Sequence, residues 1–128
     1  MLIIGNGVDI VNNLRIKKAI KNKAFIKRIY SRGEIIDSKK TKNKINFFAK
    51  RFAAKEAFVK ALGTGFSKNI NFKDISIKNK NSGKPQIFVN NKIKNILKSK
   101  FKSSKFKIYL SLSDEKKYSI AFVILNKN

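Results

Sequence analysis

The sequence contains no cysteine and no histidine, and these two absences narrow its chemistry. Without cysteine there are no disulfides and no thiol catalysis, which is consistent with a reducing compartment. Without either residue a zinc site is not expected. There is also no apolar run long enough to span a bilayer. Residues 1–11 lack the basic region and the small-residue cleavage site of a signal peptide. We therefore expect a cytoplasmic protein with no membrane partner.

Acidic residues are also scarce, with 7 Asp and Glu against 31 Lys and Arg, which gives a formal net charge of +24. A field of this sign attracts nucleic acids, anionic membranes, phosphorylated small molecules and acidic proteins. Codon bias is an alternative source, because the 27 Lys, 15 Asn and 19 Ile all have A/T-rich codons. A nucleic-acid-binding protein would more often use Arg for bidentate contacts, and only 4 Arg are present. Charge alone therefore does not identify the partner.

Hydrophobic periodicity predicts a single α+β domain over residues 1–128. Strands are predicted over 2–11, 72–78, 85–89, 106–113 and 118–125. Helices are predicted over 14–21, 24–30, 45–62 and 91–101, and the polar segment 31–44 is predicted to be mostly loop. The helix over 45–62 is apolar almost all round, as buried helices are. We expect a compact domain in which an antiparallel sheet of about five strands packs on this helix.

Two carboxylates occupy apolar elements, where an unpaired charge is costly. Asp9 lies in the strand segment Gly7-Val8-Asp9-Ile10-Val11, and Glu56 lies in the middle of the predicted buried helix. Glu56 could instead pair with Lys60 one turn later, and Asp9 could cap a turn. Two buried carboxylates in a chain without His or Cys favour a hard cation such as Mg²⁺. The other five acidic residues fall in predicted loops, turns or strand ends.

The predicted long helix also carries basic residues at helical spacing. Arg51 and Lys55 lie one turn apart, as do Glu56 and Lys60, and the helix is predicted to end at Gly63-Thr64-Gly65. Two glycines around a threonine allow a backbone to approach an anion closely, although glycine at a helix end is often only a cap. Together these residues indicate Mg²⁺ with a polyphosphate, the carboxylates binding the metal and the cations the phosphate oxygens.

These segments resemble the signature motifs of one enzyme family, the holo-acyl-carrier-protein synthases. The resemblance rests on the Gly7–Val11 segment and on the helix segment from Arg51 to Gly65, whose letters are RFAAKEAFVKALGTG. Gly83-Lys84-Pro85, the alternating segment 110–113 and the last strand agree in order. The resemblance implies a 4'-phosphopantetheinyl transferase fold and covers essentially the whole chain.

The resemblance implies an enzyme that transfers 4'-phosphopantetheine from coenzyme A to a serine hydroxyl of apo acyl carrier protein in fatty acid biosynthesis. Adenosine 3',5'-bisphosphate would be released. Asp9 and Glu56 would hold Mg²⁺ on the coenzyme A pyrophosphate, and Lys60 would contact the same phosphates, so that these three form the catalytic group. The nucleotide end of coenzyme A would contact Arg51, Gly65, Lys84 and Pro85. The serine proton requires a base, which in a chain without His is a carboxylate, a lysine or a metal-bound water. Of these we favour Glu56 or a metal-bound water.

The short members of this family also suggest the partners. They form homotrimers with sites between subunits, and they bind the acidic carrier protein through basic residues of the first helix. In this sequence the first helix carries Arg15, Lys18 and Lys21, although a solvated basic face would look the same. We expect no specific nucleic-acid target.

Two positions depart from the family pattern. Asp114 stands where many members have His, and Asn12 stands where many have Glu, so a third carboxylate for the metal is missing here. Neither change affects the three predicted catalytic residues, and we still expect an active enzyme.

Two alternatives remain open from the sequence. A basic nucleic-acid-binding module would explain the charge but not the carboxylates in apolar elements, and it would show tight, salt-sensitive RNA binding. A transferase of the same fold acting on a polyketide or peptide synthetase carrier would be distinguished by assays with several carriers.

Overall fold

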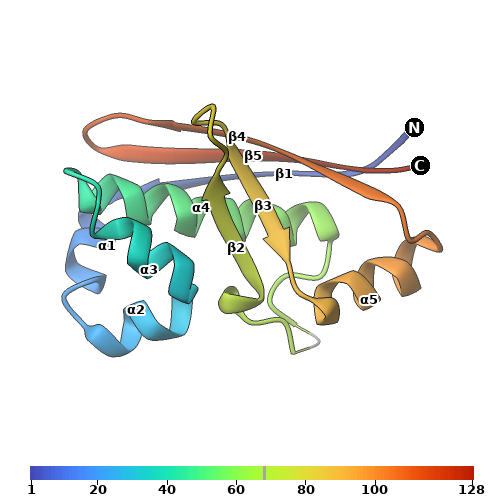
Figure 1. Cartoon of the computed structure of the whole chain (residues 1–128), viewed down its shortest axis with the longest axis horizontal. Coiled ribbons are helices and arrows are strands. Elements are labelled where there is room, and N and C mark those ends of the chain that lie inside the picture. Colours follow the sequence, from blue (N-terminus) through green and yellow to red (C-terminus); the bar gives the residue numbers. More distant parts are fainter. Residues whose placement is uncertain (68) are drawn as a thin grey trace.

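The computed structural model of the protein describes residues 1–67 and 69–128 (Figure 1). The order of elements is β1 (Leu2–Asn12), α1 (Asn13–Ala19), α2 (Lys23–Ile29), α3 (Arg32–Ser38), α4 (Lys44–Leu62), a 3-10 turn (Phe72–Asp74), β2 (Ile75–Asn79), β3 (Pro85–Val89), α5 (Asn91–Phe101), β4 (Phe106–Asp114) and β5 (Tyr118–Lys127). This is the predicted α+β order. None of the described helices is both long and apolar enough to cross a membrane.

The five predicted strands are present, but they form two antiparallel sheets rather than one. One sheet has the order β1-β5-β4, and the other is the β2-β3 hairpin. Figure 1 shows the hairpin running across the direction of the three-stranded sheet. The edge strands β3 and β4 therefore approach each other without joining in a common backbone ladder among the described residues.

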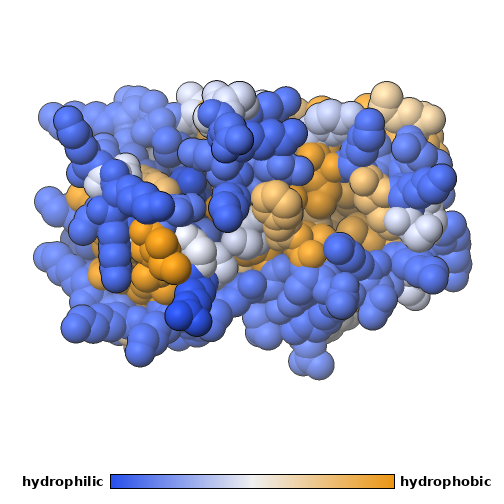
Figure 2. All heavy atoms as spheres, viewed as in Figure 1, coloured by the Kyte–Doolittle hydropathy of each residue, from blue (hydrophilic) through white to orange (hydrophobic). Residues whose placement is uncertain are grey.

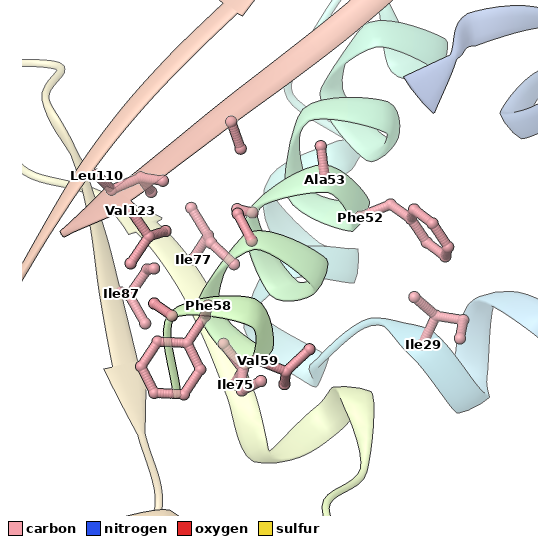
Figure 3. Packing of buried hydrophobic residues seen from close by; sticks show 14 of the residues in the cluster. Ile29, Phe52, Ala53, Phe58, Val59, Ile75, Ile77, Ile87, Leu110 and Val123 are labelled. Atoms are coloured by element: carbon pink, nitrogen blue, oxygen red, sulfur yellow. The ribbon is translucent and has the colours of Figure 1, made fainter. Parts of the chain in front are cut away.

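Helix α4 is the centre of the fold and is buried on nearly every side, as its apolar sequence predicts. Strand β1 packs against it closely enough that glycine is required at two positions. A Cβ at Gly5 would collide with the carbonyl oxygen of Ala61, and one at Gly7 with that of Ala57. Figure 3 shows side chains from the hairpin and from the three-stranded sheet, such as Ile77 and Val123, converging on one side of α4.

The segment predicted to be mostly loop contains a helix, α3, and this prediction was wrong. Ser31 and Glu34 form a capping box, in which each side chain accepts a hydrogen bond from the backbone N–H of the other residue. The Ser-x-x-Glu spacing followed by two isoleucines was the sequence signal for this helix start. The short helix was missed because the segment around it is polar and lacks a clear hydrophobic period.

Glu34 is one of the carboxylates that the sequence placed in a loop, and the structure buries it completely. Its Oε1 accepts a hydrogen bond from the Lys55 ammonium at 2.6 Å, and its Oε2 accepts one from the Ile77 backbone N–H at 2.9 Å. The Lys55 ammonium also donates to the carbonyl oxygens of Ile29 and Phe72. One ion pair therefore connects α4 to α2, α3, β2 and the 3-10 turn.

Candidate functional site

The first group of predicted site residues lies at the β1 edge of the three-stranded sheet. Asp9 on β1 and Lys60 on α4 form an ion pair of 3.1 Å, and the Lys60 ammonium also donates to the Val8 carbonyl oxygen at 3.0 Å. Glu56 lies one turn before Lys60 on the same helix. The structure thus brings the three predicted catalytic residues together. The ion pair of Lys60 is with Asp9, so the structure does not show the alternative in which Lys60 pairs with Glu56 on the helix surface.

Electrostatics at this edge favour a bound cation. Burial raises the pKa of Glu56, and the nearby Asp9 carboxylate raises it further, whereas Lys60 and Arg15 oppose the shift. Lys60 thus relieves only part of the cost of ionising Glu56. A divalent cation bound between the carboxylates would relieve the rest, so the residues present fit Mg²⁺. No group of three or more Asp, Glu, His or Cys side chains placed to share a metal ion occurs in residues 1–67 and 69–128.

Arg15 connects the carboxylates to the first helix. Its charge lowers the pKa of Glu56, and its guanidinium lies 5.4 Å from the centre of the Phe52 ring. Arg15 and Lys18 line a shallow depression of about 590 Å³ together with the exposed Leu14. Lys21 lies beyond the end of α1 and is exposed. The predicted partner-binding residues therefore lie beside the predicted catalytic group, with Lys21 furthest along the chain from it.

The second group lies at the β4 edge, around Arg51. A cavity of about 400 Å³ is lined by Arg51, Lys84 and Pro85, and also by Lys50 and Ser111. The sequence predicted the first three residues, whereas it gave no separate signal for the other two. Lys50 was identifiable only as the neighbour of Arg51.

Arg51 has an unusual environment for a guanidinium. It is 4% exposed, and its Cζ atom lies 3.5 Å from the centre of the Phe47 ring. Its Nε is buried with no hydrogen-bond partner among the described residues, and Nη1 makes only a long contact of 3.4 Å to the Phe47 carbonyl oxygen. Burial lowers its pKa. A buried donor left unpaired is costly, and the guanidinium charge would attract an anion into the cavity that Arg51 lines.

Asp114 takes part in a polar network near this cavity. The Asn46 side-chain amide donates to its Oδ2 at 2.7 Å, and the Lys50 ammonium lies 3.5 Å from its Oδ1. The aspartate at the position where the family often has His thus holds two side chains of the first turns of α4.

Gly65 lies in the exposed loop after α4. Gly63 ends the helix with φ +84°, and its N–H donates to carbonyl oxygens of the last turn, so this glycine is a cap. Gly65 has φ +59°, where glycine is favoured, and its surroundings leave an added Cβ free of contacts. The Lys100 ammonium of α5 donates to the Leu62 carbonyl oxygen at 2.7 Å and so holds the start of this loop.

Lys55 does not belong to either group. It is completely buried, and its ammonium is directed at Glu34 and two backbone carbonyl oxygens. The sequence had grouped it with the cations available for phosphate, and the structure shows that its role is structural.

The two groups face opposite edges of the sheet. β5 lies between β1 and β4, so the edges are about 10 Å apart. On α4, Arg51 and Glu56 are five residues apart and point about 140° away from each other. Within one chain, the carboxylates and the Arg51 cavity therefore open in different directions.

The outer face of the three-stranded sheet is apolar and exposed. Val8 lies opposite Phe122, and Ile10 lies opposite Ile120, on the face that points away from α4. Five apolar side chains there are between 38% and 61% exposed: Val8, Ile10, Tyr109, Ile120 and Phe122. A contiguous apolar face of this kind is typical of an interface.

Comparison with known proteins identifies the family. The sequence model of the 4'-phosphopantetheinyl transferase superfamily matches residues 5–123. The chain is 59% identical to the holo-[acyl-carrier-protein] synthase of Pelagibacter ubique over 99% of both chains, and 51% identical to that of Ehrlichia chaffeensis over 97% of both.

Solved structures agree. The crystal structure of the Neisseria meningitidis holo-[acyl-carrier-protein] synthase superposes with a TM-score of 0.89 at 38% identity, covering 98% of this chain and 100% of that one. The Bacillus anthracis synthase, in complex with CoA (3',5'-ADP), gives 0.83 at 33% identity over all of both chains. The chain therefore belongs to the 4'-phosphopantetheinyl transferase superfamily.

Proposed function

We propose that this protein is a holo-acyl-carrier-protein synthase. It transfers 4'-phosphopantetheine from coenzyme A to a serine hydroxyl of apo acyl carrier protein, in a Mg²⁺-dependent reaction that serves fatty acid biosynthesis in the cytoplasm. The observation that carries the proposal is the cluster of Asp9 on β1 with Glu56 and Lys60 on α4, because two carboxylates beside a cation suit a metal and a pyrophosphate. Relatives that cover the whole chain bear this activity in their names.

Asp9 and Glu56 are the residues that would hold Mg²⁺. When bound, the ion would neutralise charge on the pyrophosphate oxygens and stabilise the charge that develops in the transition state. Lys60, which is half exposed and adjacent to Asp9, contributes a positive charge to the same phosphates.

The reaction exchanges one P–O bond for another. The serine oxygen forms a bond to the phosphorus that carries pantetheine, and the bond from this phosphorus to the bridging oxygen breaks, which releases adenosine 3',5'-bisphosphate. The serine proton must leave at the same stage. The Glu56 carboxylate, which lies near Asp9 at this site, is proposed to accept it.

The Arg51 cavity suits the nucleotide end of coenzyme A. The Arg51 guanidinium and the exposed Lys84 would attract phosphate oxygens, and Pro85 would provide an apolar wall. Gly65, in the loop after α4, would allow the backbone to approach the same ligand. The Bacillus anthracis relative was solved in complex with CoA (3',5'-ADP) and the Helicobacter pylori relative in complex with coenzyme A, which supports coenzyme A as the ligand.

The site is proposed to be shared between subunits of a homotrimer. In one chain the carboxylates and the Arg51 cavity open at opposite edges of the sheet, so a single bound coenzyme A reaches both more easily when they come from two chains. The exposed apolar sheet face supplies the surface for this assembly.

The acidic carrier protein is proposed to bind along the first helix. Arg15 and Lys18 are exposed on it beside the apolar Leu14, and Lys21 follows in the next turn. This combination suits an acidic partner whose serine must reach the carboxylates near Arg15.

The test is mass spectrometry of apo acyl carrier protein incubated with this protein, coenzyme A and Mg²⁺, with and without EDTA. The expected result is a gain of one phosphopantetheine that EDTA prevents. Several carriers, including polyketide and peptide synthetase domains, are assayed in parallel. No gain with any carrier would refute the proposed function, and a gain that EDTA leaves unchanged would refute the metal assignment.

A further inference from the structure

A further cavity of the described residues lies away from the carboxylate group and adjoins the Arg51 cavity. It has a volume of about 770 Å³ and lies where β3, β4 and α5 converge. Figure 2 shows apolar side chains at the surface in this region, surrounded by hydrophilic ones. We call it the seam groove, because it follows the seam at which the edge strands β3 and β4 approach without sharing a backbone ladder.

The floor of the seam groove is apolar. It is formed by Ile87 and Val89 of β3, Leu97 of α5, and Ile108 and Leu110 of β4. The β4 part of the lining covers residues 106–110, and five strand residues extend about 16 Å. The floor is therefore long and narrow, which suits an extended aliphatic chain better than a compact ring system.

The rim of the groove is basic. Five lysines line it: Lys80, Lys84, Lys94, Lys98 and Lys107. No Asp or Glu is present among the described lining residues. The ion pairs of the described chain involve other lysines, namely Lys50, Lys55, Lys60 and Lys92. An apolar channel with an uncompensated cationic rim complements a molecule with an apolar chain and an anionic head.

We propose that the seam groove binds an amphiphilic anion of the fatty-acid class, with its alkyl chain along the β3–β4 seam and its head group at the lysine rim. Chain length should matter, because each additional methylene buried strengthens binding about fourfold until the groove is full. The anionic head should strengthen binding as well, because the ammonium groups of the rim lysines lie in solvent, where they can pair with it.

The seam groove adjoins the Arg51 cavity, with which it shares Lys84, Pro85 and Leu110. A bound head group at Lys84 would compete with a phosphate of coenzyme A for the same ammonium. An amphiphile is therefore expected to raise the KM for coenzyme A, a consequence that rests on the proposed function. Binding itself is measured independently of activity, so the two proposals fail separately.

The experiment is a titration of the ¹⁵N-labelled full chain with decanoate below its micelle concentration, followed by amide chemical shifts. The expected shifts lie in residues 84–89, 94–98 and 106–110. Octanoate, which is two methylenes shorter, should bind roughly 15-fold more weakly, and decanol should bind less well than decanoate. Equal shifts with acetate or inorganic phosphate would overturn the proposal, since they would show simple anion binding. Shifts centred on the outer sheet face around Val8 and Phe122 would overturn it as well.

Two variants and a control make the test specific. Ile108→Trp fills the groove and should abolish the decanoate shifts. Lys94→Glu combined with Lys98→Glu should weaken binding roughly three- to tenfold. The control, Lys39→Glu with Lys40→Glu, makes the same charge change at exposed positions after α3 and should bind like wild type. If the control variant binds decanoate as weakly as the Lys94→Glu/Lys98→Glu variant, the loss of affinity comes from net charge alone, and the proposed site is refuted. Binding of an acidic amphipathic peptide in the groove, without decanoate binding, would also refute it.

Discussion

The buried pair of Lys55 and Glu34 allows a sharp separation of stability from catalysis. Lys55 directly precedes Glu56 on α4, yet its ammonium is directed into the core. Lys55→Met should leave the Glu34 carboxylate buried with only its two backbone donors. Removal of one partner from a buried ion pair costs about 3–5 kcal/mol, a large share of the roughly 5–15 kcal/mol that stabilises a typical domain.

The double variant should not recover the loss. Apolar replacement of a buried ion pair is often neutral, but this pair also satisfies four backbone groups. The N–H groups of Ser31 and Ile77 donate to Glu34, and the carbonyl oxygens of Ile29 and Phe72 accept from Lys55. Each unpaired buried group costs about 1–3 kcal/mol, so Glu34→Leu with Lys55→Met should remain destabilised by several kcal/mol.

The assay is urea unfolding followed by circular dichroism, with turnover measured on the folded fraction. Lys60→Met is the matched control on the same helix, because its pair with Asp9 is half exposed and should be worth less than about 1 kcal/mol. Lys55→Met should lower the unfolding midpoint and retain turnover when folded. Lys60→Met should leave the midpoint nearly unchanged and lose turnover. An unchanged midpoint in Lys55→Met, or a loss of turnover without a loss of stability, would refute the structural role of Lys55.

Three further predictions concern the site and its support. Burial raises the pKa of Glu56, so as the pH rises the unfolded chain loses this proton before the folded protein does. The free energy of unfolding therefore begins to fall near the ordinary pKa of about 4.3. The full loss is present above the raised pKa. Glu56→Gln should thus raise the Tm at pH 7 with no gain at pH 3 by calorimetry, and Mg²⁺ should raise the Tm of wild type but not of this variant; a lower Tm at pH 7 would contradict the burial argument. Gly7→Ala should cost about 3 kcal/mol or more in urea unfolding, since its Cβ meets the Ala57 carbonyl, whereas Gly33→Ala, with free space around the Cβ, should be neutral or stabilise by up to about 1 kcal/mol; equal effects would disprove the close β1–α4 contact. Arg51→Ala and Glu56→Gln should each be inactive, but co-expression should restore about a quarter of the sites of a trimer if each site takes one residue from each of two chains; no restored turnover would place both residues in the same chain's site.

The most accurate predictions from the sequence concern helices and strands whose hydrophobic period shows that they are buried. The apolar helix and the Gly7–Val11 strand were each recognisable alone, and their only carboxylates were conspicuous because a charge in such an element needs a partner. The contact between Asp9 and Lys60 confirms that these two elements meet. The division of the strands into two sheets was not predictable, because each strand's pattern specifies its faces but not the strand beside it.

Glu34 shows why scarcity of a residue type was an incomplete guide. The chain has seven carboxylates, and each was judged by the apolar character of its immediate neighbours. That criterion identifies Asp9 and Glu56, which lie in long regular elements. It overlooks Glu34, which lies in a short capped helix and points into the core. Glu34 is buried because Lys55, twenty-one residues later, supplies the opposite charge and because the edge of β2 needs an acceptor. Its burial is thus a property of three elements together, and the predicted phosphate-binding role of Lys55 failed for the same reason. Within a predicted buried helix, a cation should be assigned to a ligand only after every acidic residue near a helix cap has been considered as its partner.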